Sequence, residues 1–183
     1  MALDPLKVYK IAFKGLSIGG HRFSFDIGPA FFSCFEDSEI AESAVQLELH
    51  LEKESNMLVF DFDFGGWVEM MCGRCLGEFK LPVENRQRLY VKFGELYQEE
   101  SEEVVVIPYT ESHFDISHYV YEFLHLLLPM SRVHPDDAPG VPGCDKDMLE
   151  RMRKHAPPGP GEDGGGKESP FDALKDLRFD DDA

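Results

Sequence analysis

Two cysteines lie three positions apart in the segment Cys72-Gly73-Arg74-Cys75. A tight turn that contains glycine lets two thiolates converge on one metal ion, which is the arrangement of a zinc knuckle. A thioredoxin-like redox pair usually stands at the start of a helix, whereas this segment lies between two strand patterns. Three interpretations stay open here: free thiols in a hairpin turn, a metal-binding turn and a redox pair.

A metal site needs further ligands, and His134 and Cys144 are the candidates. Both follow the main predicted helix, in a loop rich in proline and glycine. Together with Cys72 and Cys75 they predict a structural zinc site with three sulfur ligands and one nitrogen ligand. The spacing between His134 and Cys144 is wider than in common zinc fingers.

A second group of candidate residues is basic, although the chain carries 18 Lys and Arg against 35 Asp and Glu, a net charge of -17. This balance argues against nucleic-acid binding over the whole surface. Alternate residues of a strand share one face, so a strand here would group Arg86, Arg88, Tyr90 and Lys92. With Arg74 at the knuckle, they predict a contact with RNA or another partner. The alternative is a solvated strand face whose charges pair with glutamates.

No familiar catalytic pattern occurs in the sequence, which has no glycine-rich phosphate loop, no Gly-x-Ser-x-Gly and no His-Glu-x-x-His. Asp61 and Asp63 would share a strand face, but nothing in the sequence brings a third group to them. We therefore expect a protein that is not an enzyme, with structural zinc as its one expected cofactor.

Strands must position most of these residues. Apolar residues recur at every second position over 23–27, 45–51, 58–64 and 89–93, which predicts strands. The strand over 58–64 is expected to resume over 67–71, and 104–107 predicts a further short strand. Gly65-Gly66 is expected to break or bulge the strand that crosses it. This spacing predicts a mostly antiparallel sheet or a small open barrel.

One long amphipathic helix is expected between Asp115, a candidate cap, and Pro129, which ends it. It should cover one face of the sheet, so the predicted class is α+β. A weaker helix is expected over 145–155, with its apolar residues turned inward: Met148, Leu149 and Met152.

The chain is expected to form a single α+β domain over 1–155, including the knuckle. Residues 156–168 are almost all proline, glycine and charged residues, and predict a flexible linker. The remaining segment, 169–183, predicts a short helical motif and an acidic end. Its apolar residues are candidates for docking on the domain or on a partner: Phe171, Leu174 and Leu177.

The cellular location is expected to be the cytoplasm. The longest apolar run, near Phe123 to Leu128, falls far short of the roughly 20 residues of a membrane span, and the first residues show no secretory signal. Four cysteines without an export signal point to a reducing compartment. Cys34, in an apolar stretch, is expected to be a buried thiol.

The run from Trp67 to Leu76 resembles the signature of the YceD-like family, bacterial and plastid proteins linked to accumulation of large-subunit ribosomal RNA. Three features agree: the Leu128-Pro129 step that ends the helix, the loop with His134 and Cys144, and the closing segment with Phe171, Leu174 and Leu177. Some members carry more cysteines after the helix than the single Cys144 here.

The resemblance implies a non-enzymatic factor in large ribosomal subunit biogenesis that binds pre-ribosomal particles. Its implied partners are the large-subunit precursor, ribosomal RNA and ribosomal proteins, and no DNA is expected. The alternative is an acidic adaptor that binds only proteins, with a structural metal knuckle and no RNA contact.

Overall fold

The computed structural model describes residues 5–36, 38–139 and 141–156. The chain divides into two compact units, Met1–Asp145 and Lys146–Ala183, and each is described by itself. The predicted linker after Ala156 and the apolar motif at Phe171, Leu174 and Leu177 lie outside the described residues. The predicted domain and linker boundaries therefore stay predictions.

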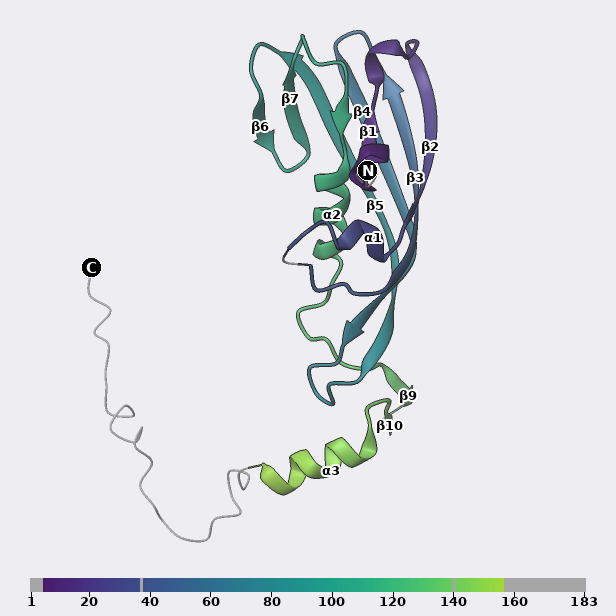
Figure 1. The fold of residues 1–183 in the computed structure, drawn as a ribbon, viewed down its shortest axis with the longest axis vertical. Coiled ribbons are helices and arrows are strands. Elements are labelled where there is room, and N and C mark those ends of the chain that lie inside the picture. The colour runs from purple at the N-terminus through teal and green to yellow at the C-terminus, as the bar shows by residue number, and fades with distance from the viewer. Residues whose placement is uncertain (1–4, 37, 140, 157–183) are drawn as a thin grey trace, which may run out of the picture. The chain divides into compact units, whose positions relative to one another are not determined.

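A six-stranded open sheet forms the first unit, in the order β2-β3-β4-β5-β7-β6 (Figure 1). Every neighbouring pair is antiparallel except β5 and β7, which run parallel. The prediction of a mostly antiparallel sheet is confirmed, in its open form. The strands are β2 (Gly19–Ile27), β3 (Ser43–Lys53), β4 (Met57–Met71), β5 (Glu78–Gly94), β6 (Gln98–Ser101) and β7 (Val104–Pro108).

Strict alternation along β3 and β4 gives the sheet one buried face and one solvated face. The buried face is the main core, and its largest fully buried side chains include Leu47, Leu49, Phe60 and Phe62. The predicted break at Gly65-Gly66 is wrong, because β4 runs through both residues without a shift of register. Gly66 has φ +146°, and a Cβ there would collide with the carbonyl oxygen of Ala44, so glycine lets β3 approach an unbroken strand.

The main helix, α2 (Ser117–Leu126), has ten residues, so the prediction of one long helix covering the sheet is wrong. The Asp115 carboxylate accepts hydrogen bonds from the backbone N–H and the hydroxyl of Ser117, at 2.9 and 2.6 Å. The N–H groups of Leu127 and Leu128 bond three residues back, which tightens the chain before Pro129. These short-range bonds shorten the helix at its C-terminal end relative to the apolar pattern.

Several short elements share the buried side of the sheet with α2 (Figure 1). They contribute aromatic rings that α2 does not supply, among them Tyr9, Phe13 and Phe31. Phe123 of α2 packs edge-on against Phe62 of β4, with ring centroids 5.2 Å apart. The elements are the 3-10 helices η1 (Pro5–Tyr9) and η2 (Phe13–Gly15), the helix α1 (Pro29–Phe32) and the paired strands β1 (Lys10–Ile11) and β8 (Phe114–Asp115).

The predicted second helix is confirmed as α3 (Lys146–His155), in the second unit. None of its residues is buried, and Met152 is 45% exposed, so the expectation that Met152 turns inward is wrong. Six of the ten residues of α3 are charged, and Met152 lies between two of them, Arg151 and Arg153. No helix in the described part of the chain is long and apolar enough to cross a membrane.

Candidate metal centre and charged sheet face

The turn between β4 and β5 holds Cys72 and Cys75 on the same side. The N–H of Cys72 donates to the carbonyl oxygen of Gly77 at 2.8 Å, and the N–H of Leu76 donates to that of Cys72 at 2.9 Å. Leu76 takes a left-handed conformation, with φ 60°, which turns the chain back toward β5. Both thiols are buried, with exposed fractions of 0% and 4%.

A small hairpin explains the wide spacing between His134 and Cys144. Strands β9 (Asp136–Ala138) and β10 (Val141–Pro142) pair antiparallel, so the chain after His134 folds back before it reaches Cys144. The N–H of Gly143 donates to the carbonyl oxygen of Pro135 at 3.2 Å, and a Cβ at Gly143 would collide with that oxygen. The hairpin therefore brings the two remaining predicted ligands to one place.

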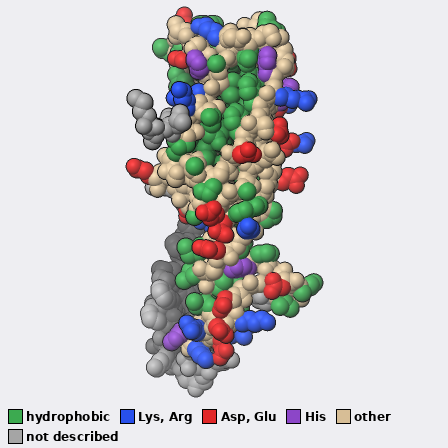
Figure 2. Space-filling view, turned by 45° about the vertical axis from the view of Figure 1, so that its right-hand side comes forward, with side chains coloured by type: hydrophobic (Ala, Val, Ile, Leu, Met, Phe, Trp, Pro, Cys, Tyr) green, Lys and Arg blue, Asp and Glu red, His purple; other side chains and the backbone are tan. Residues whose placement is uncertain are grey.

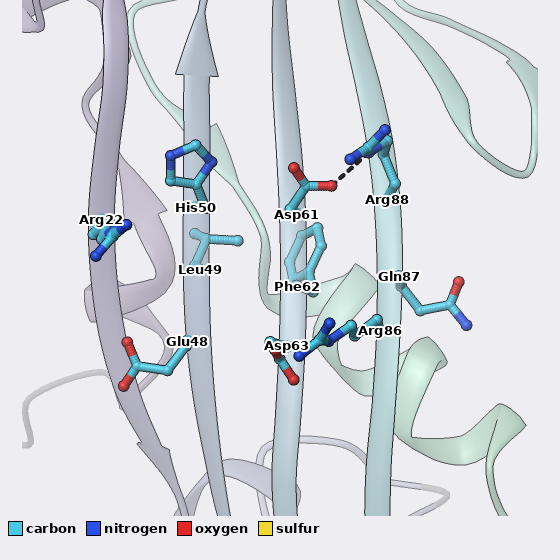
Figure 3. Close-up of a pocket in the computed structure, with 10 residues that line it drawn as sticks. All are labelled: Arg22, Glu48, Leu49, His50, Asp61, Phe62, Asp63, Arg86, Gln87 and Arg88. Carbon is cyan, nitrogen blue, oxygen red and sulfur yellow. Dashed lines mark hydrogen bonds and ion pairs between the residues drawn. The ribbon is translucent and has the colours of Figure 1, made fainter.

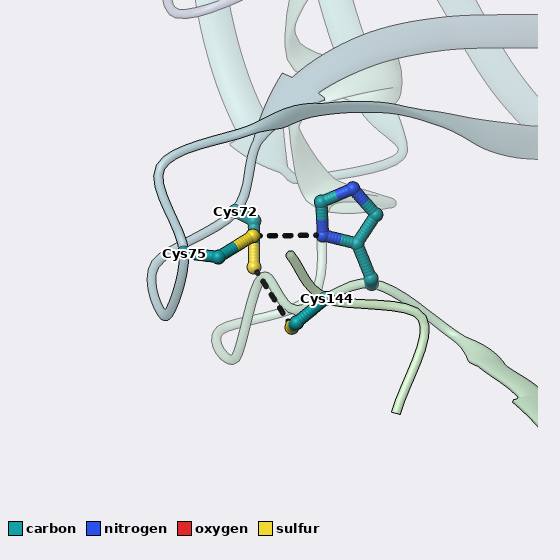
Figure 4. Close-up of side chains that lie close together, drawn as sticks. Cys72, Cys75 and Cys144 are labelled. Atoms are coloured by element: carbon teal, nitrogen blue, oxygen red, sulfur yellow. Dashed lines mark hydrogen bonds between the residues drawn. The ribbon is translucent and has the colours of Figure 1, made fainter. Parts of the chain in front are cut away.

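The four predicted ligand residues converge, with their donor atoms all within 4.8 Å of one another. The sulfurs of Cys72 and Cys144 are 3.8 Å apart, and the sulfur of Cys75 lies 3.3 Å from Nδ1 of His134 (Figure 4). A tetrahedral zinc ion with Zn–S bonds of about 2.3 Å separates its sulfur ligands by about 3.8 Å. A disulfide would need about 2.05 Å. The cluster could therefore bind a metal such as zinc.

Burial and hydrogen bonding oppose each other at the Cys72 thiol. Burial raises its pKa, but the N–H groups of Cys75, Arg74 and His134 and the His134 side chain stabilise the thiolate and bring the pKa to about 5. The N–H of Arg74 lies 3.4 Å from this sulfur. Burial and the neighbouring sulfurs raise the pKa of Cys144. A cation among the sulfurs would offset that repulsion, because metal ligands bind as thiolates.

The residues around the cluster hold its ligands in place. Nε2 of His134 lies 3.2 Å from the carbonyl oxygen of Glu78, which leaves Nδ1 as the metal-facing atom. The imidazole also packs against Phe79, with ring centroids 5.0 Å apart. The N–H of Gly73 donates to the carbonyl oxygen of Arg132 at 2.6 Å, so the knuckle and the loop after α2 are also joined through their backbones.

Cys34 lies apart from this cluster, and its expected burial is wrong. Its side chain is exposed, and its thiol donates to the carbonyl oxygen of Ala30 at 3.3 Å. It lies in the exposed turn after the short helix α1, whose buried rings Phe31 and Phe32 contribute to the core in its place. This residue is a natural control for substitutions in the cluster.

Arg86, Arg88, Tyr90 and Lys92 alternate along β5 on the solvated face of the sheet, but their cations are all paired. Arg86 binds Asp63 at 2.9 Å and Arg88 binds Asp61 at 2.5 Å, each directly across from its partner on β4 (Figure 3). Lys92 binds Glu100 at 2.7 Å. Asp61 and Tyr90 raise the pKa of Arg88. The cationic surface is therefore largely neutralised by carboxylates.

Arg74 does not join the other cations. It stands at the knuckle, and the strand from Glu78 to Arg86 separates it from them by roughly 25 Å. Lys80, nearer the knuckle, lies 3.6 Å from the centroid of the Trp67 ring. Figure 2 shows acidic and basic side chains interspersed over the surface in view, without one continuous basic patch.

Sequence reasoning offered glutamates as partners of these cations and missed the two aspartates. Asp61 and Asp63 alternate on β4 with the same period as Arg86 and Arg88 on β5, and that shared period was a usable signal for cross-strand pairing. Glu100 lies on β6, whose residues are all exposed and therefore show no alternation.

Protein purified without chelator is expected to contain about one zinc per chain. Cys75→Ser should lose the metal and lower the melting temperature by about 10 °C, because a structural metal supplies folding free energy. Elemental analysis and thermal unfolding measure both effects. Cys34→Ser, the matched control, should keep the metal; full zinc content in Cys75→Ser would show that the cluster is not the site.

Comparison with known proteins found one family whose sequence model matches the chain. The family is described as "Large ribosomal RNA subunit accumulation protein YceD", and the match covers residues 60–178, well over half of the chain. It includes the knuckle, α2 and the hairpin that carries His134 and Cys144, and it confirms the resemblance seen in the sequence. No curated protein and no solved structure matches the chain. The chain belongs to the YceD family, which is implicated in the accumulation of large-subunit ribosomal RNA.

Proposed function

We propose that this protein is a non-enzymatic factor of the cytoplasm that binds precursors of the large ribosomal subunit and supports the accumulation of their RNA. Membership in the YceD family is the observation that carries the proposal. The geometry supports a binding role, because the most sharply built site is a cluster of three buried cysteines and one half-buried histidine that could hold a metal and is not a catalytic arrangement of side chains.

The proposed role of the metal is structural zinc. Zinc bound by Cys72, Cys75, His134 and Cys144 would hold the knuckle to the loop after α2. The end of the β4–β5 ladder needs such a support because no other described strand flanks it: β3 pairs with β4 only as far as Val68, and β7 pairs with β5 only from Tyr90. The end of the β4–β5 ladder is thus a two-stranded ribbon, which is marginally stable by itself in water.

The RNA contact proposed for Arg74, Arg86, Arg88, Tyr90 and Lys92 has to compete with ion pairs inside the protein. Arg86 remains well exposed, with a side-chain exposure of 84%, so a phosphate can reach it. However, each guanidinium that binds a phosphate must share or lose its carboxylate. We therefore infer a limited RNA contact that positions the protein without supplying most of its affinity.

A second candidate is the acidic adaptor that binds only proteins. The pairing of Arg86, Arg88 and Lys92 with carboxylates favours it, as does the net charge of -17. Basic partners such as ribosomal proteins would be attracted to such a surface. The two candidates share the metal centre and differ in whether the sheet face touches RNA.

Sedimentation of a cell extract tests the proposed function directly. The tagged chain is expected to travel with immature large subunits, and RNase treatment of the extract should release it to lighter fractions. Cys34→Ser should sediment as the unchanged protein does, whereas Cys75→Ser should be lost from the particles if the metal centre supports the fold. A chain that stays among free proteins while large-subunit precursors are present would contradict the proposal.

The carboxylates on β4 offer a test of RNA contact. Asp61→Asn with Asp63→Asn frees two guanidinium groups, so affinity for a large-subunit ribosomal RNA fragment should rise about tenfold and fall more steeply with salt. Glu42→Asn with Glu111→Asn changes the net charge equally at two exposed positions outside β4 and β5, and should have a much smaller effect. Equal binding by both double variants, or by neither, would favour the protein-only adaptor.

A further inference from the structure

One long edge of the sheet has no neighbouring strand in the described part of the chain. β4 pairs with β5 from Glu78 to Lys92, whereas β7 pairs with the other edge of β5 only from Tyr90 to Gly94. The edge of β5 that precedes Tyr90 is therefore open among the described residues. Open strand edges attract extended peptides, because their backbone groups lack partners.

Hydrogen bonding shows which residues face this edge. The N–H of Tyr90 donates to the carbonyl oxygen of Glu103 at 2.8 Å, away from β4. In an antiparallel strand the backbone N–H and C=O groups of every second residue point to the same neighbouring strand. Those of Arg88 and Arg86 therefore also point away from β4, as those of Tyr90 do. Pro82 also lies an even number of residues from Tyr90, so its nitrogen points to the open edge. Proline fits there because no hydrogen bond to β4 is lost. The Asn85 side chain caps the N–H of Arg86 at 2.8 Å, so the N–H nearest β7 that still faces the edge is that of Arg88.

A groove of about 690 Å³ lies at this part of the edge. β5 forms one side at Gln87 and Arg88, the turn between β6 and β7 closes one end, and α2 forms the opposite side. Figure 1 shows α2 and the β6–β7 hairpin on the same side of β5. Apolar groups of Val105, Phe123 and Leu126 line it, and Leu126 is 76% exposed. The groove thus offers apolar contacts beside an open backbone edge.

The charge of the groove indicates which kind of peptide segment can bind in it. Four glutamates line it, and Arg88, its one lining Lys or Arg, is already bound to Asp61. Glu99 accepts a hydrogen bond from the Tyr97 hydroxyl, and Glu122 lies 3.0 Å from Nε2 of His118. The side chains of the other two glutamates, Glu102 and Glu103, have no partner among the described residues. Such a rim attracts lysine and arginine and repels phosphate.

We propose that this groove binds an extended, lysine- and arginine-rich segment of a partner protein, which adds a strand to the open edge of β5. The backbone of the segment would pair with Arg88, its basic side chains would lie over Glu102, Glu103 and Glu122, and its alternate apolar side chains would contact Phe123 and Leu126. This partner deepens the proposed function, on which it rests, because the segment would belong to a protein of the precursor particle.

A fluorescein-labelled peptide of about eight residues, with alternating lysine and valine, tests the proposal by polarisation with the full chain. Glu102→Lys with Glu103→Lys should weaken binding about tenfold or more, whereas Glu42→Lys with Glu111→Lys, outside the groove and off β5, should change it little. A peptide with glutamate in place of lysine should not bind. Equal weakening by both double variants would overturn the groove as the site and indicate general charge attraction.

A second pair of variants tests the added strand. Arg88→Pro removes the N–H on the open edge, whereas Arg88→Ala removes only the side chain, so the proline variant should bind about tenfold less tightly than the alanine variant. Thermal unfolding shows whether each Arg88 variant folds. If the proline variant does not fold, the result with Glu102→Lys and Glu103→Lys decides whether the groove is the binding site. Equal affinities in folded proline and alanine variants would overturn strand addition.

Two outcomes separate this proposal from the proposed function. If the peptide fails to bind while the chain still travels with large-subunit precursors, the groove proposal is overturned and the proposed function stands. If a single-stranded RNA displaces the peptide and binds more tightly to Glu102→Lys with Glu103→Lys, the groove takes RNA and the proposal is likewise overturned. Peptide binding that responds to the groove variants, without particle association, would support the groove and contradict the function.

Discussion

The antiparallel ladder between β4 and β5 is the constraint on which the other features depend. All fifteen residues of β4 pair with β5 in one unbroken register, from Met57 opposite Lys92 to Met71 opposite Glu78. That register places Asp61 and Asp63 opposite Arg88 and Arg86, so the charge of the exposed face is decided by the pairing. It also carries the chain directly into the turn that holds the cysteines.

The two ends of this ladder have different support. Near Tyr90 it lies within the six-stranded sheet, between β3 on one side and β7 on the other. Beyond Val68 it continues as a ribbon, and His134 and Cys144 from the loop after α2 meet the knuckle there. A metal at this point would connect segments far apart in the chain, which stabilises a ribbon that has little core of its own. In the middle of the ladder, the edge of β5 that faces away from β4 has no neighbouring strand among the described residues and no metal cluster beside it. The groove lies along this part of the edge.

The sequence was most informative where side chains repeat with the period of a strand. Val45 to Leu51 and Leu58 to Phe64 alternate so regularly that the buried face was predictable. The convergence of Cys72, Cys75, His134 and Cys144 was predictable as a set. Local periodicity does not report register, so the carboxylates opposite Arg86 and Arg88 were not foreseen. The apolar pattern around α2 continues past Leu126, and only the observed short-range bonds show where the helix ends. The sequence distance between His134 and Cys144 was misleading because the β9–β10 hairpin intervenes.

Residue-resolved hydrogen exchange along β5 tests the central claim most directly. Alternate amides of β5 bond to β4, and Tyr90 bonds to Glu103, so Leu89 and Tyr90 should exchange slowly. The amide of Arg88, between Gln87 and Leu89 on the open edge, should exchange much faster in the free protein and become protected when the basic peptide is added. Slow exchange at Arg88 in the free protein, equal to that at Leu89, would contradict the account, because it would mean that the edge is already paired.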